Sequence, residues 1–177
     1  MPRYVAFLRG MNLGGRRIKN PELCEAFARL GFAEVSAFLA SGNVVFEGEG
    51  AEAKVRDRLE RGLAEELGYE VPSFIRRAVQ VKELASSERF SGRKGADARG
   101  KLQVVFLQKE PTKAGRRLIA TLDGDEDWLE VRGREVLWWP RGGMSESPLD
   151  LKALEKGVGP TTIRTIRTVE RLAAKLL

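Results

Sequence analysis

The order of β-rich and helical segments in the first 80 residues constrains the fold more than any other feature of this sequence. Runs of aromatic and branched residues alternate with stretches whose apolar residues recur at helical spacing. In chain order they predict a strand over 3–9, a helix over 20–30, a hairpin over 34–48, a helix over 51–68 and a strand over 71–79. This β-α-β-β-α-β order is that of the split, ferredoxin-like unit, which we expect over residues 1–80.

Turn and cap residues mark the ends of these segments. Asn20 is expected to cap the first helix, and Gly31 follows its end. The turn Ser41-Gly42-Asn43 joins the two strands of the hairpin, because Gly and Asn tolerate positive φ angles. Pro72 has no amide hydrogen to give to a neighbouring strand, so the fourth strand is expected at an edge of the sheet.

The second half repeats this order of elements in part. A helix over 81–90 leads into a glycine-rich basic linker, so residues 81–101 are expected to separate two subdomains. The elements expected next are a strand over 102–108, a helix over 112–122, a hairpin that turns at Gly133-Arg134, a helix between Ser147 and Gly157, and a last helix from Thr161 to the C-terminus. The predicted fold is therefore α+β, with a ferredoxin-like unit followed by a related, degenerate β-α-β-β-α-α unit over 102–177.

Composition excludes several classes of chemistry. The chain has no histidine and a single cysteine, Cys24, which rules out Ser-His-Asp and Cys-His catalysis, histidine-containing zinc sites and an intrachain disulfide. The acidic run 123–127 lacks the pattern of a calcium-binding loop, so neither a metal nor a cofactor is predicted. The first residues do not read as a signal peptide, and no stretch approaches about 20 apolar residues. We therefore expect a cytoplasmic protein that does not enter a membrane.

Residues 7–20, FLRGMNLGGRRIKN, combine glycines with cationic side chains directly after the first strand, in a chain of net charge +6. In a β-α-β-β-α-β unit this loop and the turn between the second and third strands emerge at the same end of the sheet, where the first helix also begins. Glycine lets backbone amides approach a ligand, and arginine forks onto phosphate or carboxylate oxygens. The predicted anion-binding residues are Arg9, Asn12, Gly14, Gly15, Arg16, Lys19, Ser41 and Asn43. The alternative is that the glycines only form left-handed turns and the arginines are only solvated.

The C-terminal segment 161–177 has the pattern of an amphipathic helix. At about 100° per residue its cationic side chains form a basic stripe on one side, made of Arg164, Arg167, Arg171 and Lys175. Such a stripe suits a nucleic-acid backbone or an anionic membrane surface, and it is equally the pattern of the solvated side of a packed helix. Both interpretations are left open by the sequence.

Residues 4–47 resemble the opening of a bacterial family, domain of unknown function 1697. Its members begin with a strand, Arg-Gly-Ile-Asn-Val-Gly-Gly, a helix ending Leu-Gly-Phe and a Ser-Gly-Asn-Val-Val-Phe hairpin, matched here by RGMNLGG, LGF and SGNVVF. Weaker similarity extends along the rest of the chain. The resemblance implies a two-subdomain α+β fold and no established activity. Near the C-terminus this chain departs from the family pattern, because Thr165, Ile166 and Arg167 replace Asn, Trp and Asn.

Three functions fit these observations. The first is a binding protein for a phosphorylated or other anionic ligand, RNA included, at the loop after the first strand and the turn of the first hairpin. The second is an enzyme that acts on a small anionic substrate, with Asn, Ser and Arg side chains stabilising developing charge. The third is a non-catalytic interaction module that uses the second sheet. The sequence leaves the oligomeric state open.

Overall fold

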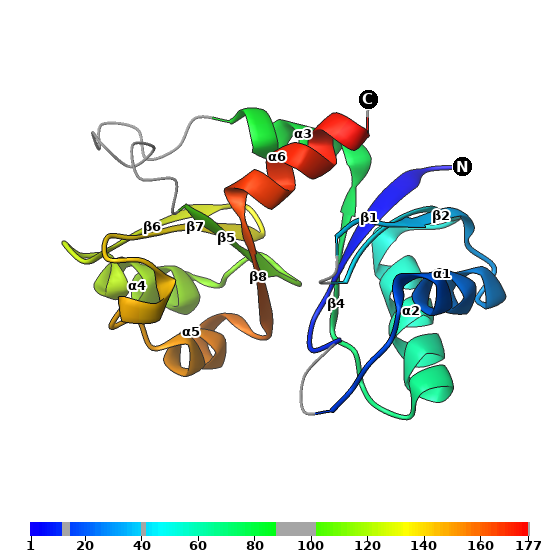
Figure 1. The fold of residues 1–177 in the computed structure, drawn as a ribbon. Coiled ribbons are helices and arrows are strands. Elements are labelled where there is room, and N and C mark those ends of the chain that lie inside the picture. Colours follow the sequence, from blue (N-terminus) through cyan, green and yellow to red (C-terminus); the bar gives the residue numbers. More distant parts are fainter. Residues whose placement is uncertain (12–14, 40–41, 88–101, 177) are drawn as a thin grey trace. The chain divides into compact units, whose positions relative to one another are not determined.

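The computed structural model describes residues 1–11, 15–39, 42–87 and 102–176, which divide into two compact units (Figure 1). Met1–Lys82, with Leu176, belong to the first unit, and Glu83–Lys175 form the second. Each unit has one four-stranded antiparallel sheet. The predicted two-unit α+β fold is confirmed. The predicted glycine-rich linker lies entirely outside the described residues.

The first unit has the predicted β-α-β-β-α-β order, followed directly by a third helix. Its elements are β1 (Arg3–Leu8), α1 (Asn20–Arg29), β2 (Ala33–Ala37), β3 (Asn43–Glu47), α2 (Glu52–Leu67) and β4 (Ser73–Arg77). Helix α3 (Ala78–Ser86) begins in the first unit and ends in the second, which starts at Glu83. The strand order in the sheet is β2-β3-β1-β4, so β4 lies at an edge as Pro72 indicated. The helix predicted over 81–90 begins earlier, at the end of β4.

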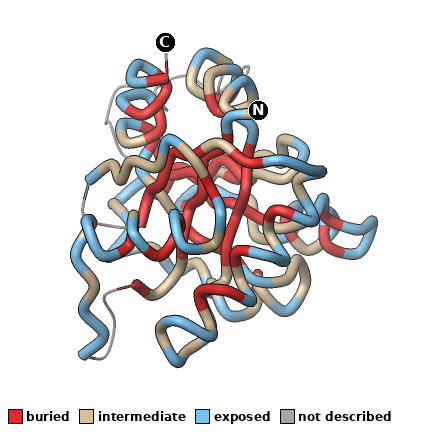
Figure 2. The backbone as a smooth tube through the Cα atoms, turned by 90° about the vertical axis from the view of Figure 1, so that its right-hand side faces the viewer, coloured by how far each residue is buried: buried red, intermediate tan, exposed pale blue. Residues whose placement is uncertain are grey.

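The core of the first unit lies between its sheet and the two helices α1 and α2. Figure 1 shows both helices on the same face of the sheet, and Tyr4, Ala6 and Leu8 of β1 point into this core. The alternate residues Val5 and Phe7 are also fully buried, so both faces of β1 are covered. Most residues of β1, β3 and β4 are buried, whereas α1 and α2 contain both buried and exposed residues, as the colours along the trace in Figure 2 show. Each fully buried large apolar side chain contributes roughly 1.5–3 kcal/mol to stability, so this apolar pattern explains why the sheet forms.

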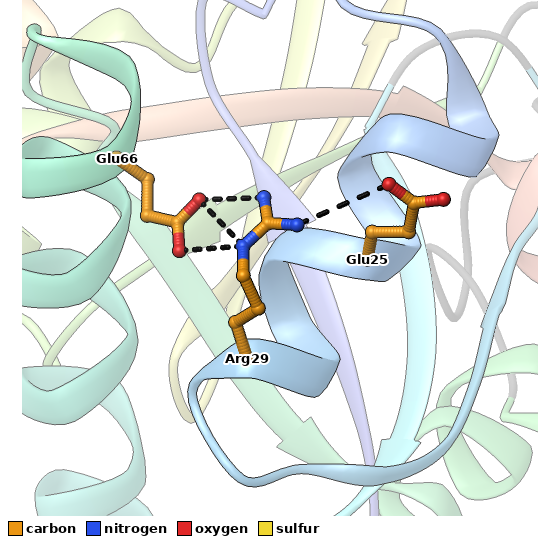
Figure 3. Close-up of polar contacts among 3 residues, drawn as sticks. All are labelled: Glu25, Arg29 and Glu66. Atoms are coloured by element: carbon orange, nitrogen blue, oxygen red, sulfur yellow. Dashed lines mark hydrogen bonds and ion pairs between the residues drawn. The ribbon is translucent and has the colours of Figure 1, made fainter.

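Polar contacts fasten α1 to α2 on the outer side of this core. The guanidinium of Arg29 on α1 donates three hydrogen bonds to the carboxylate of Glu66 on α2, two from Nε and one from Nη2, and its Nη1 lies 3.9 Å from Glu25 Oε2 (Figure 3). Arg58 of α2 donates to the carbonyl oxygen of Leu30 at the end of α1. At the C-terminal end of α1, Arg58 thus gives a partner to a carbonyl oxygen that the helix itself leaves without one.

The second unit contains one strand more than the sequence predicted. Its elements are β5 (Gln103–Leu107), α4 (Lys113–Leu122), β6 (Asp127–Arg132), β7 (Glu135–Pro140), a 3-10 turn (Met144–Glu146), α5 (Leu151–Val158), β8 (Thr161–Thr165) and α6 (Ile166–Lys175). The prediction of a helix over residues 161–165 is wrong, because this segment pairs with β5 along its whole length. Four of its five residues are β-branched and suit a pleated sheet. Pairing with β5 therefore outweighs the helical spacing of the arginines in the sequence.

The two units therefore share one plan, a β-α-β-β-α-β unit followed by a helix. The strand orders β2-β3-β1-β4 and β6-β7-β5-β8 correspond element by element. Val5 of β1 pairs with Arg76 of β4, and at the equivalent place Val104 of β5 pairs with Arg164 of β8. The segments that contain the two arginines, 72–76 (PSFIR) and 160–164 (PTTIR), share three identical residues.

Side-chain contacts repeat as well. Glu60 of α2 accepts a hydrogen bond from the amide of Ser73 at 3.1 Å, and Glu155 of α5 accepts one from the amide of Thr161 at 3.1 Å. In both units a helix carboxylate holds the first residue of the last strand. The duplication inferred from the order of elements thus extends to individual residues, in a segment that the sequence pattern had assigned to a helix.

Two helix starts differ from the prediction. The capping position of α1 is Lys19, whose amide donates to Glu22 Oε2 at 3.2 Å, so Asn20 is not the cap but the first helical residue. Helix α5 begins after Asp150, whose carboxylate accepts from the amide of Ala153, and not at Ser147.

Across the part of the chain that the structure describes, no helix has both the length and the apolar character needed to cross a bilayer.

Candidate functional site

Three connections of the first unit meet at one end of its sheet, where β1 ends. They are the β1–α1 connection (9–19), the β2–β3 connection (38–42) and the α2–β4 connection (68–72), and we call them together the loop end of the first unit. The amide of Leu8 donates to the carbonyl oxygen of Gly42 at 2.8 Å, and the amide of Arg9 donates to that of Pro72 at 3.1 Å. The end of β1 is therefore hydrogen-bonded to both the β2–β3 and the α2–β4 connections. The topology had predicted that the β1–α1 and β2–β3 connections lie at the same end of the sheet.

Gly42 of the hairpin turn packs closely against the end of β1 and against Met11. Its φ angle is +74°, and a Cβ atom at this position would lie 2.9 Å from Met11 Cγ, 3.1 Å from Leu8 Cβ and 3.3 Å from the carbonyl oxygen of Leu8. Both the backbone angle and the space exclude a side chain. Gly15 also has a positive φ of +83°, but no atom lies within 4 Å of its hypothetical Cβ. Gly15 therefore lies in a turn with open space beside it, whereas Gly42 lies where the turn packs closely against its neighbours.

The cationic side chains of the loop end are exposed, and one of them is held by an aromatic ring. Arg16, Arg17 and Lys19 are exposed, and Arg9 is half-buried. The guanidinium carbon of Arg16 lies 4.1 Å from the centre of the Tyr69 ring, which belongs to the α2–β4 connection. A stacked guanidinium keeps its N–H donors at its edge, where an anion can reach them.

The first residue of α1 joins the helix to the hairpin. Asn20 donates from Nδ2 to the carbonyl oxygen of Leu39 at 3.0 Å. Leu39 has a positive φ of +61°, which is uncommon for a residue with a branched side chain, and that side chain is 38% exposed. The hydrogen bond from Asn20 is one of the contacts that hold this strained residue in place.

The remaining predicted residues differ in what the structure says of them. Asn43 is only 1% exposed, and its Nδ2 donates to the carbonyl oxygen of Phe38 at 3.0 Å, so its amide nitrogen closes the hairpin. Asn12, Gly14 and Ser41 lie outside the described residues. That Arg9, Gly15, Arg16, Lys19 and Asn43 bind a ligand stays a prediction.

The second unit supplies an internal comparison for the loop end. The connections of the first unit contain eleven (9–19), five (38–42) and five (68–72) residues, and their equivalents in the second unit contain five (108–112), two (133–134) and two (159–160). The amide of Leu107 donates to the carbonyl oxygen of Arg134 at 2.8 Å, as that of Leu8 does to Gly42, so the same fold closes with the shorter connections. The additional residues of the first unit are not needed to form the fold.

The two ends also differ in charge. Residues 9–19 contain four cationic and no acidic side chains, whereas residues 108–112 contain Lys109 and Glu110. Around Gly133 the nearest atoms to a hypothetical Cβ are carboxylate oxygens of Glu110 and Glu135, at 3.9 and 4.0 Å. The long, uniformly basic connection is therefore specific to the first unit.

The structure divides the predicted basic stripe. Arg164 lies in β8 and not on a helix, and its Nη1 donates to Thr162 Oγ1 and to the carbonyl oxygen of Ile163, both at 2.9 Å. Burial lowers the pKa of the Arg164 guanidinium to about 10. Arg167, Arg171 and Lys175 remain on the exposed side of α6. That this shorter stripe contacts a nucleic acid stays a prediction.

Sequence reasoning missed two polar or aromatic arrangements. Tyr69 gave no signal because its contact with Arg16 joins segments far apart in the chain. Asp127, part of the acidic run in the sequence, is 4% exposed, and its Oδ1 accepts from Trp138 Nε1 at 2.7 Å and from Ser147 Oγ at 2.6 Å. Its role is to hold the second unit together. Among the side chains that the structure describes, no group of three or more acidic or cysteine residues is placed to hold a metal ion.

Comparison with known proteins agrees with this architecture. A solved structure of the conserved bacterial protein SP0830 from Streptococcus pneumoniae superposes with a TM-score of 0.71 at 19% sequence identity, over 99% of this chain and 98% of that one. At this identity the likeness concerns the fold. No curated protein matches the sequence significantly. A family model described as a protein of unknown function, DUF1697, matches residues 1–137, which include the whole loop end of the first unit. From this match and the shared two-unit fold, we conclude that the chain belongs to the DUF1697 family.

Proposed function

We propose that the loop end of the first unit binds a phosphorylated or otherwise anionic ligand, RNA included. The observation that carries the proposal is the difference between the two units. The same fold needs nine residues in total for these three connections in the second unit and has twenty-one in the first. Long connections at one end of a rigid sheet are where binding residues concentrate.

Electrostatics favours an anion at this place. Arg9, Arg16, Arg17 and Lys19 bring four positive charges into eleven residues without an acidic neighbour in the same stretch. Helix α1 begins directly after them, and the N-terminal end of a helix favours negative charge. Glu22 in the first turn of α1 already accepts the amide of Lys19, so the arginine and lysine side chains supply the main attraction.

The guanidinium of Arg16 is partly ordered before any ligand arrives. Its stacking on Tyr69 at 4.1 Å restricts a side chain that would otherwise lose much rotational freedom on binding. Charge-assisted hydrogen bonds from such a group to phosphate oxygens are among the stronger polar contacts in proteins. Arg16 and Lys19 are therefore the first residues to test.

The test is calorimetric titration of the whole chain with pyrophosphate and with a six-nucleotide RNA. The double variant Arg16→Gln, Lys19→Gln is expected to bind at least about tenfold more weakly, since the loss of even one of its two charge-assisted contacts corresponds to about 1.4 kcal/mol. The double variant Lys109→Gln, Arg117→Gln changes the net charge by the same amount at exposed positions of the second unit, and it is expected to bind within about twofold of the unmodified chain. Binding of the RNA should weaken steeply with salt. Equal losses in the two double variants would exclude the loop end as the site.

A further inference from the structure

We infer that the ligand of the loop end carries a nucleobase next to its phosphate, and that the base stacks on the guanidinium of Arg16. This inference rests on the proposed function, because it names the class of anion that the same site takes. The shared chemistry is that of a nucleoside phosphate, present both in free nucleotides and in single-stranded RNA.

The Tyr69 ring over which Arg16 lies is held in place by the core of the first unit. Tyr69 is half-buried and packs against the apolar core of the first unit. The guanidinium of Arg16 lies over this ring, with its carbon atom 4.1 Å from the ring centre. The ring over which Arg16 lies is thus held by the core, and Arg16 itself is exposed.

A planar guanidinium held in this way offers two kinds of contact at once. Its outer side accepts the flat surface of a base, a mode of recognition common for single-stranded RNA. Its N–H donors make no hydrogen bond or ion pair with any residue in 1–11, 15–39, 42–87 or 102–176. They can therefore hold a phosphate while the base lies on the plane. Binding of a simple anion would need only the charge, which Arg17 and Lys19 already provide without a ring.

The second unit again shows that the fold does not require this arrangement. At the place of the α2–β4 connection it has only Gly159-Pro160, which contains no aromatic residue. At the place of the long β1–α1 connection it has residues 108–112, which contain no arginine. The Arg16–Tyr69 stack is thus an addition to the shared scaffold, located within the long basic end.

The test compares two ligands that differ only in the base, AMP and ribose 5-phosphate, by calorimetric titration of the whole chain. The unmodified chain is expected to bind AMP at least fivefold more tightly, since stacking of one base on a protein side chain typically supplies about 1 kcal/mol or more. Arg16→Lys keeps the charge and removes the plane, so it should reduce the preference for AMP below about twofold while ribose 5-phosphate still binds. Tyr69→Leu should do the same, and Tyr69→Phe, which keeps the ring, should retain the preference. Arg117→Lys, at an exposed position on α4, is the matched control and should change neither affinity.

The outcomes separate this inference from the proposed function. If the unmodified chain binds both ligands equally well, the inference fails and the anion site stands. If neither ligand, nor pyrophosphate, binds, both fail. A preference for AMP that survives in Arg16→Lys and in Tyr69→Leu would place the base elsewhere and also overturn the inference. With a hexamer of adenylate as a further ligand, a steeper salt dependence than that of AMP identifies an RNA strand as the source, and equal dependence identifies a mononucleotide.

Discussion

Replacing Gly42 by alanine tests how tightly the hairpin turn packs on the end of β1. The residue has a φ of +74°, and a Cβ atom would lie 3.1 Å from Leu8 Cβ and 3.3 Å from the carbonyl oxygen of Leu8. The nearest atom, Met11 Cγ at 2.9 Å, belongs to a flexible side chain that can move. The Leu8 atoms are part of a buried strand and its backbone, so there the turn itself must shift.

The expected cost has two parts. Placing alanine in the left-handed region costs about 1 kcal/mol, reduced by a few tenths because alanine also restricts the unfolded chain. The contact with Leu8 adds about 1–2 kcal/mol, as is typical for an additional methyl group in a closely packed place. The total destabilisation is therefore about 2–3 kcal/mol, which corresponds to a decrease in Tm of about 10 °C or more for a unit of this size.

Gly68→Ala is the matched control. Gly68 caps the end of α2 with a φ of +79°, nearly that of Gly42, and nothing lies within 4 Å of its hypothetical Cβ. Its substitution should cost only the backbone part, about 1 kcal/mol. Urea unfolding followed by far-ultraviolet circular dichroism measures both changes. Hydrogen exchange at the amide of Leu8, which is bonded to the carbonyl oxygen of Gly42 at 2.8 Å, reports the local loosening.

Two results would refute this reasoning. Equal destabilisation by Gly42→Ala and Gly68→Ala would mean that the close contact with Leu8 contributes nothing. Unchanged exchange at Leu8 in the Gly42 variant would mean that the hairpin turn and β1 are not coupled through this hydrogen bond. Either result would show that the hairpin turn is not tightly fixed to the end of β1.

Two further predictions concern contacts away from the site. The hydrogen bonds from Arg29 hold the pKa of the Glu66 carboxyl below its ordinary value of 4.5, so their contribution is present above that pH and is lost as the pH falls through the lowered pKa. Glu66→Gln should therefore flatten the acid side of the stability–pH profile, by the small amount typical of an exposed pair, and an unaltered profile would contradict the assignment. Asp127→Ala leaves the buried indole N–H of Trp138 without the acceptor it has at 2.7 Å, and should lower the free energy of unfolding by about 2–3 kcal/mol in urea titrations followed by tryptophan fluorescence. Ser147→Ala is the control, because it leaves the indole of Trp138 paired with Asp127. If Asp127→Ala lowers the free energy of unfolding no more than Ser147→Ala does, the indole contact is unimportant for stability.

The first unit shows how far local patterns can predict a fold. Apolar residues at strand and helix spacing, with Gly68 and Pro72 as markers of ends and edges, predicted every element of the β-α-β-β-α-β order. These signals are local, because each depends on backbone preferences and on which side of one segment is apolar. The same order also predicted correctly that the β1–α1 connection and the hairpin turn lie at one end of the sheet.

The second unit shows where such patterns fail. Residues 161–165 contain Arg164 at a spacing that continues the basic side of α6, which favours a helix when the segment is examined alone. In the folded unit the segment pairs with β5 from Thr161 to Thr165. The gain from pairing with a strand more than fifty residues away depends on the whole unit, so no local pattern could reveal it.

The sequence by itself determined the two-unit α+β plan, the position of the long basic connection and its excess of positive charge. Only the tertiary structure decided that Tyr69 supports Arg16, that Asn43 is buried in the closure of its hairpin and that Arg164 belongs to a strand. The physical reason is that strand and helix preferences are properties of neighbouring residues, whereas these contacts join segments that meet only when the sheet and its helices pack around one core.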